Sequence, residues 1–173
     1  MAAGQQLFPD WFTVSERPHL LRGAASAWFD GDGVGTQPRN IIDEGSLTGY
    51  ILSVYSARRL GLETTGNAGG ARNLLAAPGG KGSRNLMEAM QDGLYVTEVM
   101  GQGVNLITGD YSRGAAGFLV RNGEIQHPVE EITIAGNLRD MFSQIVAVGN
   151  NIDTRGNIHC GSILLGSMTV AGE

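Results

Sequence analysis

Apolar and polar residues alternate over many short stretches of the chain, and the clearest stretch surrounds Asn122-Gly123. Asn-Gly is the strongest short-range signal for a type I′ β-turn, because both central residues of that turn need positive φ. Residues 117–121 and 124–126 are therefore predicted to pair as a β-hairpin. We expect the other strands to lie around this hairpin.

A second hairpin is predicted over residues 39–52, with its turn at Glu44-Gly45. Leu47, Gly49 and Ile51 share one face of its second strand, which is the period of two that strands require. Aromatic and β-branched residues after Pro9, up to Val14, favour another strand. Further strands are expected over residues 94–100, 129–135, 145–148, 163–165 and 168–170.

Three stretches carry apolar residues at helical spacing instead. Residues 54–60 are predicted to form a helix that ends at Gly61. A second helix is expected to begin at Ser83 as N-cap, with Leu86, Met87 and Met90 as its apolar stripe, and a third, residues 138–142, follows Asn137 as cap. About ten strands and three short helices predict a mainly β (α+β) fold, with a mostly antiparallel sheet that is barrel-like or folded over itself.

Composition limits the classes of protein that remain. The 173 residues suit one domain, 1–173, and the uncapped start is interpreted as the C-terminal part of a longer protein. The net charge of −5, with scattered basic residues, argues against nucleic-acid binding. No apolar run is long enough for a membrane span, and no signal peptide is recognisable, so a cytoplasmic location is expected. The 27 glycines have no fixed period and indicate tight turns.

The chain offers little catalytic chemistry. Its three histidines are far apart, and HExxH, GxSxG and CxxC motifs are absent. Residues 29–35 resemble a calcium loop only at their start, and a turn with Asx hydrogen bonds is predicted there. Cys160 beside His159 is the single pair with ligand or nucleophile potential, and a small buried apolar residue is the alternative interpretation of Cys160. We therefore expect no catalytic residue and no metal site, with Cys160 as the one candidate ligand.

A run of small residues precedes the first hairpin: Ser112, Arg113, Gly114, Ala115, Ala116 and Gly117. Within a strand, such residues leave the backbone approachable by another backbone or by a peptide. The alternative is that they only allow tight packing within the sheet. Both interpretations stay open from the sequence.

Several ordered blocks, covering essentially the whole chain, resemble the C-terminal domain of the PmbA/TldD family. They include SARRLGL-x-TTGNAGG from residue 56, VTEVMGQGVN from residue 96, GDYSRGAAGF from residue 109 and EITIAGNL from residue 131. In the family, TldD-type members bind zinc through an HExxxH helix and a cysteine near the C-terminus. Cys160-Gly161-Ser162 falls at the place of that cysteine, while the segment from Ala115 to Ile125 resembles the PmbA-type members, which lack the histidine pair.

The resemblance implies a non-catalytic partner subunit or domain of a TldD-PmbA-type zinc metalloprotease complex that degrades or processes unfolded peptides. This chain would hold no cofactor, with zinc in the TldD-type partner, and the assembly would be a homo- or heterodimer. The candidate peptide groove consists of the run from Ser112 to Gly117 together with Cys160 and Gly161. A catalytically competent metallopeptidase domain and a regulatory protein-binding module, such as a modulator of DNA gyrase, are the alternatives.

Overall fold

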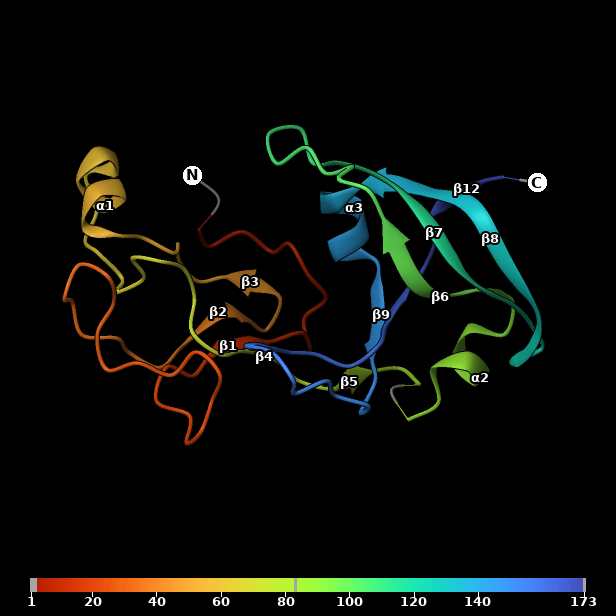
Figure 1. The fold of residues 1–173 in the computed structure, drawn as a ribbon, viewed down its shortest axis with the longest axis horizontal. Helices are drawn as coiled ribbons and strands as arrows, with labels where there is room; N and C mark the ends of the chain where they lie inside the picture. The colour runs from red at the N-terminus through yellow and green to blue at the C-terminus, as the bar shows by residue number, and fades with distance from the viewer. Residues whose placement is uncertain (1–2, 83, 173) are drawn as a thin grey trace. The chain divides into compact units, whose positions relative to one another are not determined.

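The structure is a computed structural model and describes residues 3–82 and 84–172. Twelve strands and three short helices lie within that part of the chain (Figure 1). It divides into two compact units, Met1–Pro78 with Asn151–Gly161 (unit 1) and Gly79–Asn150 with Ser162–Glu173 (unit 2). All paired strands but one pair are antiparallel, so the mainly β prediction with three short helices is confirmed.

Unit 1 contains one five-stranded sheet in the order β10-β4-β1-β2-β3. The strand β10 comes from the returning segment Asn151–Gly161 and pairs in parallel with β4, with Ile158 opposite Leu74. The strands of this sheet are β1 (Val14–Glu16), β2 (Arg39–Asp43), β3 (Ser46–Leu47), β4 (Leu74–Ala76) and β10 (Ile158–His159).

Two strand predictions in unit 1 need correction. The aromatic run before Val14 forms a turn, in which the Phe12 N–H donates to the Pro9 carbonyl and the Phe12 ring stacks on Phe8. The strand β1 therefore begins only at Val14. The hairpin at Glu44-Gly45 is confirmed, but its second strand ends at Leu47, because the Leu52 N–H and carbonyl bond to Thr65 and not to β2.

Local signals in unit 1 predict one helix and one turn correctly, whereas the strands β4 and β10 were not predicted. Helix α1 (Val54–Leu60) has the cap Gly61 at φ 67°, as the sequence predicted. The turn from Phe29 to Gly35 is also confirmed, since the Asp30 carboxylate accepts from the N–H groups of Asp32 and Val34. These signals succeed because each bond joins residues only a few positions apart.

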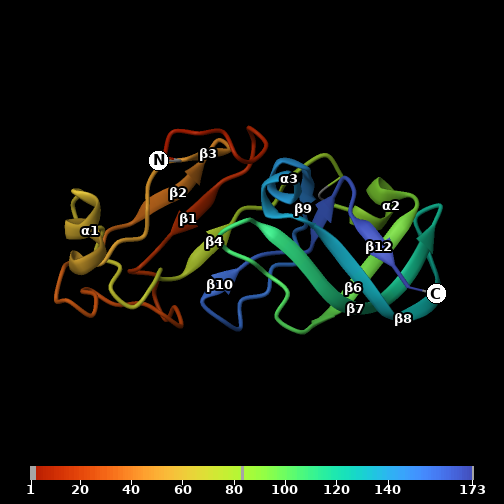
Figure 2. The same cartoon turned by 90° about the horizontal axis from the view of Figure 1, so that it is seen from above.

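Unit 2 contains a four-stranded sheet in the order β12-β8-β7-β6, whose strands lie side by side in Figures 1 and 2. The Asn122-Gly123 turn is confirmed, with φ values of 51° and 77°. The segment expected as a separate strand at 129–135 is instead the far part of β8. Pro128 lies opposite Phe118 of β7, between two register shifts of the β7–β8 ladder, and β12 pairs only with residues beyond it, so Pro128 has a neighbouring strand on one side alone. The strands are β6 (Gly93–Met100), β7 (Asp110–Arg121), β8 (Glu124–Asn137) and β12 (Thr169–Ala171).

A small sheet and two helices complete unit 2. The sheet has the order β11-β9-β5, from Ile163–Leu165, Ile145–Val148 and Gly79–Gly80. Helix α2 (Leu86–Met90) is capped by Asn85, and the expected cap Ser83 lies outside the described residues. Helix α3 (Leu138–Ser143) is capped by Asn137, as predicted. None of the described helices is long and apolar enough to cross a membrane.

Candidate functional site

The small-residue run lies in β7, between two neighbouring strands. Gly114 pairs with Met100 of β6 and Thr133 of β8, and Ala115 pairs with Val99 and Ile132. The backbone of this part of β7 is therefore flanked by a strand on each side. A peptide that binds by backbone pairing would have to use another strand.

Packing within the sheet explains two of the small residues. A Cβ on Gly117 would clash with the carbonyl oxygen of Tyr95 and lie 2.9 Å from the Cα of Val96, next to a register shift in β6. Ala115 is fully buried and packs with Ile132 and Ile134. In contrast, a Cβ on Gly114 would meet Met100 only at ordinary contact distances, the shortest being 3.7 Å. Tight packing therefore accounts for Ala115 and Gly117 but not for Gly114.

The strand β6 forms one of the two edges of this sheet, opposite β12. It pairs only with β7 among the described residues, and its eight residues make it longer than any other edge strand there. Its second half is exposed, with Val99 40% and Met100 45% accessible. An exposed edge presents unpaired N–H and C=O groups to an added strand. Since Val99 and Met100 pair with Ala115 and Gly114, the predicted run lies directly beside this edge.

Arg113 lies across the end of β6. Its Nε is 3.4 Å from the Met100 carbonyl oxygen and its Nη2 is 3.5 Å from the Val99 carbonyl oxygen. The guanidinium thereby places a positive charge at the C-terminal end of the open edge. The predicted residues Arg113 and Gly114 thus both contact the exposed half of β6.

Cys160 and Gly161 belong to unit 1, whereas the run from Ser112 to Gly117 belongs to unit 2. The half-buried Cys160 thiol lies 3.2 Å from the Gly161 carbonyl oxygen, and burial raises the pKa of that thiol. His159 Nε2 lies 3.1 Å from the Gly156 carbonyl oxygen. A nucleophilic cysteine needs a lowered pKa and a neighbouring base, so this geometry disfavours the Cys160–His159 pair as a catalytic dyad.

The residues around Cys160 also do not fit a zinc ion. Zinc sites in enzymes take three protein ligands, and no three His, Cys, Asp or Glu side chains converge within residues 3–82 and 84–172. The nearest acid along the hairpin, Asp153, is held by the guanidinium of Arg155, with Nη2 to Oδ2 at 2.7 Å. That pairing lowers the pKa of Asp153. Cys160 therefore lacks companions for metal binding among the described residues.

A buried polar network in unit 1 was not predicted from the sequence. Glu16 is only 2% exposed, and its Oε2 lies 3.0 Å from Arg39 Nε. Its Oε1 accepts from Asn67 Nδ2 and from the Arg72 N–H, both at 2.7 Å. Asn67 Oδ1 in turn accepts from Arg39 Nη2 at 2.7 Å. The network joins β1 and β2 to the loop around Asn67, and no local sequence pattern predicts it, because Glu16 and Asn67 are 51 positions apart.

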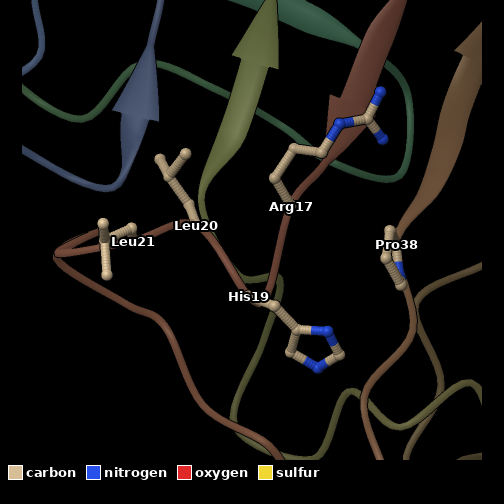
Figure 3. Close-up of a pocket in the computed structure, with 5 residues that line it drawn as sticks. All are labelled: Arg17, His19, Leu20, Leu21 and Pro38. Carbon is tan, nitrogen blue, oxygen red and sulfur yellow. The ribbon is translucent and has the colours of Figure 1, made fainter.

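A surface hollow of about 320 Å³ also lies in unit 1 (Figure 3). Leu20, Leu21 and Pro38 supply apolar walls, and Arg17 and His19 complete the lining. In Figure 3 the Arg17 side chain extends between Leu20 and Pro38, while the His19 ring turns the opposite way. No local motif predicted this hollow, because it is formed where the chain after β1 meets the approach to β2.

Comparison with known proteins identifies the relatives of this chain. Residues 1–172 match the family described as the PmbA/TldA metallopeptidase C-terminal domain. A protein named metalloprotease PmbA from Escherichia coli O157:H7 is 59% identical over 170 residues, which are 98% of this chain and 38% of that protein.

Solved structures share the fold. A proposed modulator of DNA gyrase from Bacteroides thetaiotaomicron superposes with a TM-score of 0.91 at 30% identity, over 99% of this chain and 39% of that one. TldE from Thermococcus kodakarensis superposes with a TM-score of 0.81 at 20% identity, over 99% of this chain and 42% of that one, which supports a common fold alone. The chain thus spans about two fifths of the length of these relatives.

Proposed function

The chain belongs to the PmbA/TldD metallopeptidase family, and on that premise we propose that it is the non-catalytic partner of a TldD-type subunit. The complex would be a zinc-dependent peptidase that degrades or processes unfolded peptides, and zinc would be held by the TldD-type subunit. The observation that carries this proposal is the 59% identity to a metalloprotease named PmbA, over 98% of the chain. The partners of Cys160 and His159 support assigning the hydrolytic chemistry to the other subunit.

The open edge of β6 supports a peptide-binding role for unit 2. An extended peptide can add to an exposed sheet edge through its backbone, which gives affinity without a requirement for particular side chains. The exposed half of β6 offers such an edge, beside the small residues of β7. Arg113 would limit how far the added strand extends along β6.

Adjacent proline variants test the edge. Successive residues of a strand direct their N–H groups to opposite sides, so Glu98→Pro and Val99→Pro remove one N–H from the open edge and one from the β6–β7 ladder. The variant that loses an N–H of the β6–β7 ladder should have a lower melting temperature than the wild-type chain. The other variant, which loses an N–H of the open edge, should keep the wild-type melting temperature but lose most of the peptide binding measured by fluorescence polarisation. Unchanged binding by the stably folded variant would contradict the edge proposal.

The assignment of catalysis is tested with separated subunits. The chain alone should cleave no peptide and bind no stoichiometric zinc, whereas its mixture with the TldD-type subunit should cleave a labelled unfolded peptide. Cys160→Ser should leave the activity and the zinc content of the mixture unchanged. About one zinc per chain, with peptidase activity from the isolated chain, would overturn the partner role.

The proposal also covers the domain organisation of the chain, its assembly and its location in the cell. Residues 1–173 would act as one C-terminal domain of a longer protein, in a cytoplasmic heterodimer. Light scattering of the mixed subunits measures the assembly, and limited proteolysis of the full-length protein measures the domain boundary. Cleavage between the two units at low protease concentration would argue against a single domain.

A further inference from the structure

We propose that the hollow beside Arg17 is a second peptide site, which takes a free C-terminal carboxylate next to an aliphatic side chain. The inference rests on the proposed function in one respect, since its ligand is a peptide. It concerns unit 1 alone and does not involve the edge of β6.

The guanidinium of Arg17 has N–H groups that form no hydrogen bond among the described residues. Within the described residues, its one hydrogen bond runs from Nη1 to the Glu16 carbonyl oxygen at 3.3 Å. Nε and Nη2 therefore remain for a ligand. A planar guanidinium binds a carboxylate through two parallel N–H···O bonds, which no amide or hydroxyl reproduces.

The backbone under Arg17 is held firmly. The Arg17 N–H lies 3.2 Å and 3.1 Å from the carbonyl oxygens of Arg72 and Asn73, and the Arg17 carbonyl accepts from Asn73 Nδ2 at 3.0 Å. Asn73 and Pro18 are both fully buried. A site on such a frame loses little conformational entropy when a ligand binds.

Apolar walls adjoin this cation. Leu20, Leu21 and Pro38 line the hollow, and Leu21 is 89% exposed, so a ligand can cover it. A volume of about 320 Å³ accommodates one aliphatic side chain with its carboxylate. A phosphate chain is a poorer match, since a single arginine lines the hollow and several phosphates need clustered cations.

His19 connects the hollow to an optical probe. The Thr36 hydroxyl donates its hydrogen to the Ala27 carbonyl, so it accepts from His19 Nε2 at 3.0 Å. The His19 ring stacks on Trp28, with ring centres 4.3 Å apart. Trp28 is 74% exposed, and Trp11 is the other tryptophan of the chain. In a Trp11→Phe background, fluorescence reports on Trp28 alone.

The test measures, by the fluorescence of Trp28 in the Trp11→Phe background, how tightly three acetylated pentapeptides bind to the full chain. The first ends in leucine with a free carboxylate, the second ends in leucine amide, and the third is an amide with an internal aspartate. The free acid should bind about tenfold more tightly than either amide, because only it pairs its end with Arg17 beside an apolar contact. Arg17→Gln should abolish this difference. Arg58→Gln, an exposed arginine of α1 in the same unit, is the matched control and should keep it.

Equal binding of the free acid and leucine amide by the wild-type chain would overturn the proposal, and this comparison needs no variant. Tight binding of the aspartate peptide would overturn the assignment to a C-terminal carboxylate. Circular dichroism checks that Arg17→Gln is folded. Binding is measured on this chain without a partner subunit. A mixture without peptidase activity would therefore contradict the proposed function, whereas a lack of acid-selective binding would contradict only the carboxylate site.

Discussion

The two units are stabilised in different ways. Every buried polar or charged side chain among the described residues, Glu16, Asp30, Thr36, Asn67 and Asn73, lies in unit 1. The buried side chains of unit 2 are apolar and come from strands of up to fourteen residues. Unit 1 has no strand longer than five residues among those described. It therefore relies on side-chain bonds to hold its loops, whereas unit 2 relies on ladders and apolar packing.

This difference indicates where each unit is sensitive. A bonded polar group in the interior has few acceptable replacements, because its loss leaves its partners unsatisfied. Truncating a buried apolar side chain lowers the free energy of unfolding roughly in proportion to the volume removed. Unit 1 should therefore respond to changes of charge, and unit 2 to changes of size.

Glu16→Gln should have the largest effect. Removing one partner of a buried ion pair leaves Arg39 uncompensated, and the expected loss is about 4 kcal/mol of unfolding free energy, measured by urea denaturation. Asp92→Asn is the control, because its pair with Arg121 is exposed and 3.8 Å long, and it should change stability by less than about 0.5 kcal/mol. Hydrogen exchange should show lost protection only in unit 1. Equal losses in both units would instead show that the chain unfolds as one cooperative body.

Ile134→Ala should come next. Ile134 is 6% exposed and packs with Ala115 and Ile132, so truncation should cost about 3 kcal/mol. The control Ile125→Ala lies on the same strand but is 46% exposed, and should cost less than about 1 kcal/mol. Here the lost hydrogen-exchange protection should be confined to unit 2. If Ile134→Ala lost as little unfolding free energy as the control, unit 2 would not depend on apolar packing at this position, and the difference between the two units would be wrong.

Asp30 should make unit 1 sensitive to acid. The Ala68 N–H, and then those of Val34 and Asp32, hold the pKa of Asp30 below its ordinary 3.8 against the opposing effect of burial. A lowered pKa stabilises the fold above about pH 3.8, and that stability is lost as the pH falls through the folded-state pKa.

Asp30→Asn should therefore melt several degrees below wild type near neutral pH, and the difference should narrow as the pH falls below 3.8. Thermal melts across this range measure it. Asp10→Asn, at an exposed position, is the control and should show no such change. A difference independent of pH would assign the effect to packing and not to the charge of Asp30.

Gly123→Ala should give the smallest effect. Its φ of 77° disfavours any side chain, and a Cβ would lie 3.2 Å from the Cα of Glu88, so about 1 kcal/mol should be lost from unit 2. Gly35→Ala in unit 1 is the control, because its φ is not in the left-handed region and nothing lies within 4 Å. That variant should be neutral or slightly stabilising in the same denaturation experiment.

The sequence predicted those features that depend on neighbours in the chain. Asn122-Gly123, Gly61 and Asn137 each act over a few residues, and each was located correctly. Strand lengths were harder to predict, because β8 continues through Pro128 at a place where only β7 pairs with it and β12 does not reach. That condition depends on a partner more than thirty residues away.

The candidate site shows the same limit. The unusual composition of 112–117 could be recognised, but the sequence could not show that β7 has a strand on each side and that β6 is the open one. The contact of Glu16 with Asn67 spans 51 positions and leaves no local pattern. From the sequence, a glutamate in a short strand is predicted to be exposed, because its hydrogen-bond partners are not known.

The parallel pairing of β10 with β4 also orders events on the ribosome. All of Gly79–Asn150 is translated after β4 and before β10. Throughout that interval one side of β4 is open to chaperones and to other nascent chains. Unit 1 reaches its native sheet only after most of unit 2 has left the exit tunnel, so the first half of the chain finishes folding late.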